Sequence, residues 1–129
     1  MSLADYADPP EIETGTKAYL KDAAGNETGD WLLIRSFRSA AFQRAVLRSQ
    51  AMLAEGDDPD KVREAMIERR AALVAGWSDD AECTPDAVKA LLRQSTRIAQ
   101  FVDAFAAEDA NFFGRALSGL SRGQAKSSS

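Results

Sequence analysis

Two pairs of adjacent carboxylates are the residues of this chain whose type and spacing come closest to a metal site. Asp57-Asp58 and Asp79-Asp80 could each bind a divalent cation, which prefers oxygen ligands. Both pairs stand where a helix cap or a solvated loop already accounts for them, and neither has the ligand spacing of an EF-hand. We therefore expect no metal site.

Cys83 is the one thiol of the chain, and it precedes an expected helix start, where a helix dipole can lower a thiol pKa. The sequence contains no histidine, so no Cys-His dyad and no imidazole metal ligand can form. No glycine-rich turn is followed by Lys and Ser or Thr, as a phosphate-binding loop requires. We expect an inert thiol and a non-enzymatic protein without cofactor.

Four arginines, Arg35, Arg38, Arg44 and Arg48, follow one another without an intervening acid. The whole chain nevertheless has a net charge of -4, whereas nucleic acid is bound mainly by neutralising phosphates. We favour a solvated helix face, or pairing with the acidic residues before position 15, over a phosphate track.

The helices expected on either side of residues 55–59 could be mistaken for a helix-turn-helix. Arg63, Arg69 and Arg70 would then face a DNA groove. Glu64 and Glu68 share that surface, however, and would repel phosphate. A small DNA-binding regulator is therefore kept only as an alternative function.

The length of 129 residues suits one domain, and 45% apolar with 28% charged residues is typical of a globular chain. We expect a flexible acidic arm over residues 1–15, a globular domain over 16–113 and a flexible tail over 114–129. No apolar run approaches the ~18 residues of a membrane span, and the N-terminus lacks the features of a signal peptide. These features indicate a cytoplasmic protein without membrane contact.

The elements that would position these residues are a hairpin and about four helices. Turn-forming residues 22–29 separate β-rich segments 16–21 and 30–36, which predicts a β-hairpin with a long loop. Helices are expected from the cap residue Ser39, from Asp58-Pro59 to about Gly76, from Thr84-Pro85, and beyond a break near Ser95. The predicted fold is α+β, mostly α, with the N-terminal hairpin packed on the helices and disordered termini.

Aromatic side chains at helical or strand spacing are expected mainly in the core, as we predict for Trp77, Phe101 and Phe105. The second helix should bury a stripe of Val62, Met66, Leu73 and Trp77.

A second group of apolar residues is predicted to bind protein. Phe112 and Phe113 project about 100° apart on a helix, so both cannot easily enter one core. Trp31 and Leu33 share one face of the second strand, whose opposite face is also apolar. So much apolar surface on a small domain predicts a homo-oligomer.

Three passages in order resemble the tail assembly chaperones of long-tailed phages and prophages. The first is a strand, a helix-cap serine and an early aromatic, Ser39 and Phe42. The second is an apolar helix ending in Gly76-Trp77, then Thr84-Pro85 opening a helix. The third is an amphipathic helix carrying Phe101 and Phe105, closed by Asn111-Phe112. The likeness covers about residues 15–126.

This resemblance implies a chaperone that coats and solubilises the long tape measure protein, recruits tail tube subunits, and is absent from the mature virion. No nucleotide is implied. A structural head-tail connector or minor tail protein is the first alternative, and the DNA-binding regulator is the second.

Overall fold

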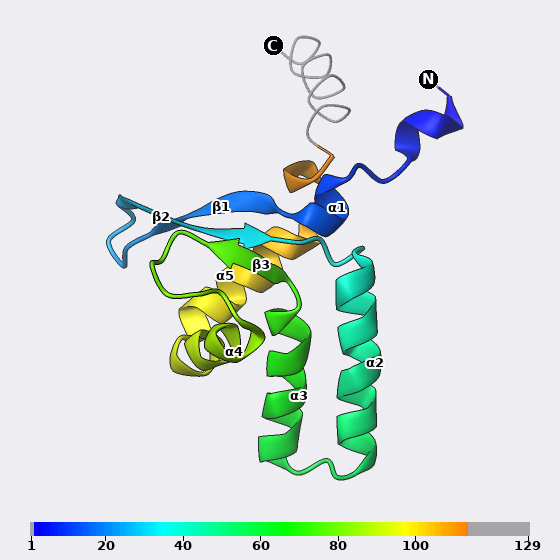
Figure 1. The fold of residues 1–129 in the computed structure, drawn as a ribbon, viewed down its shortest axis with the longest axis vertical. Coiled ribbons are helices and arrows are strands. Elements are labelled where there is room, and N and C mark those ends of the chain that lie inside the picture. The colour runs from blue at the N-terminus through cyan, green and yellow to red at the C-terminus, as the bar shows by residue number, and fades with distance from the viewer. Residues whose placement is uncertain (1, 114–129) are drawn as a thin grey trace.

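The computed structural model describes residues 2–113, so the tail predicted over 114–129 lies outside the described residues (Figure 1). The predicted mostly helical α+β fold is confirmed. Its elements follow in chain order: η1 (Leu3–Tyr6), α1 (Glu11–Thr14), β1 (Thr16–Lys21), β2 (Glu27–Ile34), α2 (Ala40–Ala54), α3 (Pro59–Ala71), β3 (Val74–Trp77), α4 (Pro85–Gln94), α5 (Thr96–Ala107) and η2 (Asp109–Asn111).

The hairpin predicted at the N-terminal side is present, with its second strand beginning three residues earlier than expected. Strands β1 and β2 pair antiparallel, with Tyr19 opposite Trp31 and Lys17 opposite Leu33. Because side chains alternate along a strand, Leu32 and Ile34 are buried while Trp31 and Leu33 lie on the other face. The expected assignment of these four residues to opposite faces is confirmed.

A third strand, β3, was not expected, and the prediction that one helix continues to Gly76 is wrong. Helix α3 ends at Ala71, and β3 then pairs antiparallel with β2, placing Trp77 opposite Leu32. The backbone N–H of Arg35 also donates to the carbonyl of Leu73 at 2.7 Å. As a strand, Val74–Trp77 gains backbone hydrogen bonds from the free edge of β2. As a helix it would gain less, because valine, glycine and tryptophan have low helix propensity.

Because the helix ends earlier, the apolar stripe predicted for it is also wrong in part. Trp77 belongs to the sheet, and Val62 is 40% exposed on α3. Leu73 is fully buried, but in the turn between α3 and β3.

Hydroxyl and carboxylate caps begin the helices where the sequence places them. Ser39 accepts from the N–H of Phe42 at 3.2 Å, Asp58 from Lys61 at 3.0 Å, and Thr84 from Ala87 at 3.1 Å. Ser95 alone separates α4 from α5: its N–H donates to the carbonyl of Leu91, and its hydroxyl accepts from the N–H of Ile98. The predicted break between these helices is confirmed.

Helix α5 lies against the sheet and α4 packs on α3 and α5, while α2 packs along α3 and projects with it as a helical hairpin (Figure 1). The core joins the inner side chains of the sheet to those of α3, α4 and α5. Its fully buried members include Ile34, Leu73, Val88 and Val102.

The extended arm predicted over residues 1–15 is wrong at its C-terminal end. Residues 11–14 form α1, and Ile12 is only 3% exposed. The carbonyl of Ile12 accepts from the N–H of Ser36, and the Glu13 carboxylate accepts from the N–H of Ala40. One buried apolar side chain, one backbone hydrogen bond and one carboxylate that accepts from a backbone N–H thus attach this segment to the domain, which a tally of its prolines and acids does not reveal.

Candidate functional site

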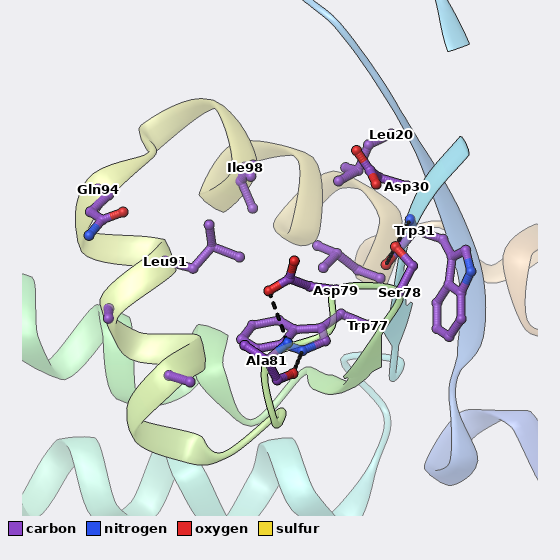
Figure 2. A pocket seen from close by; sticks show the side chains of 13 residues that line it. Leu20, Asp30, Trp31, Trp77, Ser78, Asp79, Ala81, Leu91, Gln94 and Ile98 are labelled. Atoms are coloured by element: carbon purple, nitrogen blue, oxygen red, sulfur yellow. Dashed lines mark hydrogen bonds between the residues drawn. The ribbon is translucent and has the colours of Figure 1, made fainter. Parts of the chain in front are cut away.

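An apolar groove runs between the sheet and helices α4 and α5 (Figure 2). It consists of a hollow of about 500 Å³ and an adjoining hollow of about 330 Å³, which share Leu20 and Ile98 as lining residues. We call these two hollows together the apolar groove. Its main apolar side chains are Leu20, Leu32, Trp77, Leu91, Ile98 and Phe101.

The indole of Trp77 lies within the groove beside α4 (Figure 2). Its Nε1 donates to the carbonyl of Ala81 at 2.7 Å, so its polar group is satisfied within the protein. The ring is therefore free to offer apolar surface to an occupant. Trp77 was predicted to be a core residue, whereas it is half-buried and packs against the core from the groove side.

Strand pairing holds the floor of the groove in place. The N–H of Trp31 donates to the Ser78 hydroxyl at 2.9 Å, and the N–H of Ser78 donates to the carbonyl of Trp31 at 3.0 Å. These bonds extend the β2–β3 ladder beyond Trp77, and they fix the loop that carries Asp79 at the rim.

Charges of opposite sign lie at the two hollows. Asp30 and Asp79 line the larger hollow, whereas Lys21 and Arg97 line the smaller one. Arg97 Nη1 donates to the carbonyl of Lys21 at 3.0 Å, which links α5 to the end of β1. Because the acceptor is a neutral carbonyl, this contact cancels neither the charge of Arg97 nor that of Lys21. The groove is apolar along its length and electrically asymmetric.

The face of the sheet turned away from the helices carries a second apolar surface, here called the outer sheet face: Lys17, Tyr19, Trp31 and Leu33. Tyr19 is 58% exposed, and Trp31 and Leu33 are half-buried. Lys17 Nζ lies 4.5 Å from the centroid of the Trp31 ring, a cation–π contact that holds the indole against the strand. Trp31 and Leu33, both predicted to bind protein, thus remain accessible together.

The other predicted binding pair is divided by the structure. Phe112 is 2% exposed and belongs to the core, so its prediction as a binding residue is wrong, whereas Phe113 is half-buried. The chain turns into η2 after Glu108, which directs the Phe112 ring back onto Phe105. Adjacent rings therefore separate, as the helical spacing predicted, but the inward ring is firmly buried.

Phe42, Phe101 and Phe105 are half-buried at the margin of the core. Phe42 stacks on Phe37 with ring centroids 4.8 Å apart. Phe101 also lines the groove, so this residue, predicted to be structural, contributes both to the core margin and to the groove.

Most arginines considered for phosphate or DNA binding are engaged within the fold, whereas Arg44 forms no ion pair with residues 2–113. Arg70 pairs with Asp103 at 2.9 Å and Arg69 donates to the Ser49 hydroxyl at 2.6 Å. Arg38 pairs with Asp109, rather than with the acids of the N-terminal segment. Helices α2 and α3 lie side by side in a hairpin (Figure 1). Packing contacts therefore occupy surface of α3 that a recognition helix would insert into a DNA groove.

Sequence reasoning did not identify the groove. The signal that was missed is Val74–Trp77 as a strand, because that strand places Trp77 opposite α4 and α5. Without that strand, the sequence predicts only that the apolar side chains of α4 and α5 are core residues.

Over residues 2–113, no three His, Cys, Asp or Glu side chains are grouped so as to hold a metal ion. Burial raises the pKa of the Cys83 thiol, which leaves it protonated and a poor nucleophile at neutral pH. No helix in the described part of the chain has the length and apolar character that crossing a bilayer demands.

Comparisons with protein-family models, curated proteins and solved structures give no match.

Proposed function

We propose that this protein is a non-enzymatic tail assembly chaperone whose apolar groove binds the apolar face of the tape measure protein in the host cytoplasm. The observation that carries the proposal is that two hollows with apolar walls adjoin, since both are lined by Leu20 and Ile98. Adjoining apolar hollows suit an elongated ligand better than a compact one. The sequence resemblance supplies the identity of the client.

An amphipathic helix presents apolar side chains at positions i, i+3, i+4 and i+7, the pattern that helix-in-groove recognition uses. Trp77, Leu91 and Ile98 offer apolar contacts on such a path, and each Leu-sized side chain that leaves water contributes about 1.5–3 kcal/mol. The acidic hollow and the basic hollow favour one direction of the bound helix.

The outer sheet face has a separate role in this proposal. Trp31, Tyr19 and Leu33 form the surface through which the chaperone associates with further copies of itself. Trp31 and Tyr19 also border the groove, whereas its walls on α4 and α5 stay open to the client. Tail tube subunits would then displace the chaperone from the tape measure protein as the tube polymerises.

The test is coexpression with the tape measure protein of the same phage or prophage, with the soluble fraction of that client measured. Ile98→Asp places a carboxylate in the groove and should abolish solubilisation. Leu47→Asp is the matched control, because Leu47 is 66% exposed on α2 and lies outside the groove lining. Melting temperatures of both variants show whether each still folds.

A tape measure protein that stays insoluble with the native chain, or that is solubilised equally by Ile98→Asp, would contradict the proposal. Purified virions give a second readout. A chaperone should be absent from them, whereas recovery of the chain at a fixed number of copies per particle would favour a head-tail connector or minor tail protein.

A further inference from the structure

A second cavity, of about 330 Å³, lies between α2, α3, β3 and the beginning of α4. Its charged lining is four cations and one acid, which we call the basic pocket: Arg35, Arg44, Arg48, Lys89 and Glu68. The concentration of positive charge is notable because the chain as a whole carries a net charge of -4.

Glu68 is the only acid among these lining residues, and it is shared by two cations. Its carboxylate accepts from Arg48 Nε at 2.9 Å and from Lys89 Nζ at 2.7 Å. These two partners lower the pKa of Glu68, so it remains ionised, but one negative charge cannot neutralise both.

The remaining cations are not neutralised by their contacts in the fold. Arg35 donates from Nε to the carbonyl of Glu13 and from Nη1 to the carbonyl of Ala72, both at 2.9 Å, which fixes its guanidinium without cancelling its charge. Arg44 forms no ion pair with any residue from 2 to 113. Arg44 and Arg48 lie four residues apart on α2, an arrangement that repulsion makes unfavourable for the helix alone.

Neutral groups complete the wall. The Cys83 thiol adds no charge while protonated, and alanines and Val88 supply the apolar part of the lining. The cavity is small enough to exclude a duplex but can hold a phosphate group and part of the molecule that bears it.

We propose that the basic pocket binds a phosphate-class oxyanion, either free phosphate or the phosphate group of a small molecule. Arg44 and Arg35 provide the guanidinium donors, which match phosphate oxygens in geometry, and Lys89 and Arg48 add positive charge beside Glu68. This site lies apart from the apolar groove, and its occupancy does not depend on the proposed chaperone function.

The experiment is isothermal titration of the full chain with inorganic phosphate and, separately, with adenosine monophosphate, at constant ionic strength. We expect saturable binding that Arg44→Gln weakens about tenfold, the effect of one lost charge-assisted contact. Glu68→Gln should act in the opposite direction and tighten binding, because it removes the only negative charge of the pocket. Arg63→Gln is the control, since Arg63 is an arginine outside the pocket, and it should leave the dissociation constant unchanged.

Tighter binding of adenosine monophosphate than of phosphate would identify a phosphorylated small molecule as the ligand, and equal binding would identify free phosphate. Absence of binding of both probes at about 10 mM would overturn the proposal. The proposal would also fail if the Arg44→Gln and Arg63→Gln variants bound the two probes equally well. Arg44-dependent binding of a duplex oligonucleotide at higher affinity than both probes would replace it with a nucleic-acid surface.

Discussion

The ring of Phe112 meets the ring of Phe105 edge to face, with centroids 5.7 Å apart and planes inclined at 82°. This contact fastens the segment after α5 to the last turn of that helix. Asn111 adds a second tie, because its side-chain amide donates to the carbonyl of Phe105 at 3.0 Å. The described chain therefore ends in a packed corner, and the two adjacent phenylalanines there have different environments.

Replacing Phe112 by alanine should lower the free energy of unfolding by about 3–4 kcal/mol, since a buried aromatic ring leaves a cavity. Chemical denaturation monitored by circular dichroism measures the loss. Phe113→Ala is the matched control and should lose less than half as much. Equal losses would show that both rings are core residues.

Phe113 lines neither hollow of the groove, so Phe113→Ser tests for a client contact beyond it. We expect weaker binding of the tape measure protein with little change in melting temperature, because the half-buried ring can contact a partner. Pull-down with the coexpressed client, beside a thermal melt, gives both quantities. A large fall in melting temperature would instead assign the Phe113 ring to the core.

Glu68 should make stability depend on pH. Lys89 and Arg48 lower its pKa in the folded protein below the usual value of 4.5, so its stabilising contribution is present above that value and is lost as pH falls through the folded pKa. Near pH 7, Glu68→Gln should cost about 1–2 kcal/mol, because the side chain is only 16% exposed and two cations lose their partner.

Denaturation at a series of pH values checks this expectation, and the difference between native chain and Glu68→Gln should shrink below about pH 4.5. Asp60→Asn, on an 86% exposed side chain of α3, is the control and should lose little stability. A difference that stayed constant down to pH 3 would contradict the assignment.

Gly15 is the residue where α1 turns into β1, and Gly15→Ala should destabilise the fold by more than about 2 kcal/mol. Its φ is +96°, and an added Cβ would lie 3.0 Å from Leu33 Cγ and 3.3 Å from the backbone of Ile34. Gly25→Ala isolates the conformational part, since Gly25 has φ +89° in open space, and should cost about 1 kcal/mol. Equal unfolding free energies for the two variants would show that Leu33 yields without cost.

Trp31→Glu should shift any oligomer toward monomer, because it places a carboxylate on the outer sheet face. Sedimentation velocity measures the change. Tyr6→Glu alters a residue that is 64% exposed in η1, away from that face, and should leave the distribution unchanged. A native chain that sediments as a monomer at all concentrations would exclude self-association through this surface.

The local signals in this sequence predicted the helix starts well. Ser39, Asp58-Pro59 and Thr84-Pro85 each combine a side-chain acceptor with a favourable first turn, and that chemistry acts within a few residues. The break at Ser95 follows from the same logic. These features need no knowledge of the rest of the fold.

The features that sequence reasoning missed depend on distant partners. Val74–Trp77 becomes a strand because β2, forty residues earlier, offers an unpaired edge. Ile12 is buried, and its carbonyl accepts from the N–H of Ser36, a residue that lies far from it in sequence. The groove escaped notice for the same reason, since its walls come from three regions of the chain.

A single residue, Ser95, joins the two helices that form one wall of the groove, and Leu91 and Ile98 lie on either side of it. Rotation about the backbone of that one residue would change the angle between α4 and α5, and with it the width of the channel. Two hydrogen bonds at Ser95 and the packing of α4 on α5 hold that angle, so a single cap residue sets the width available to anything that enters the groove.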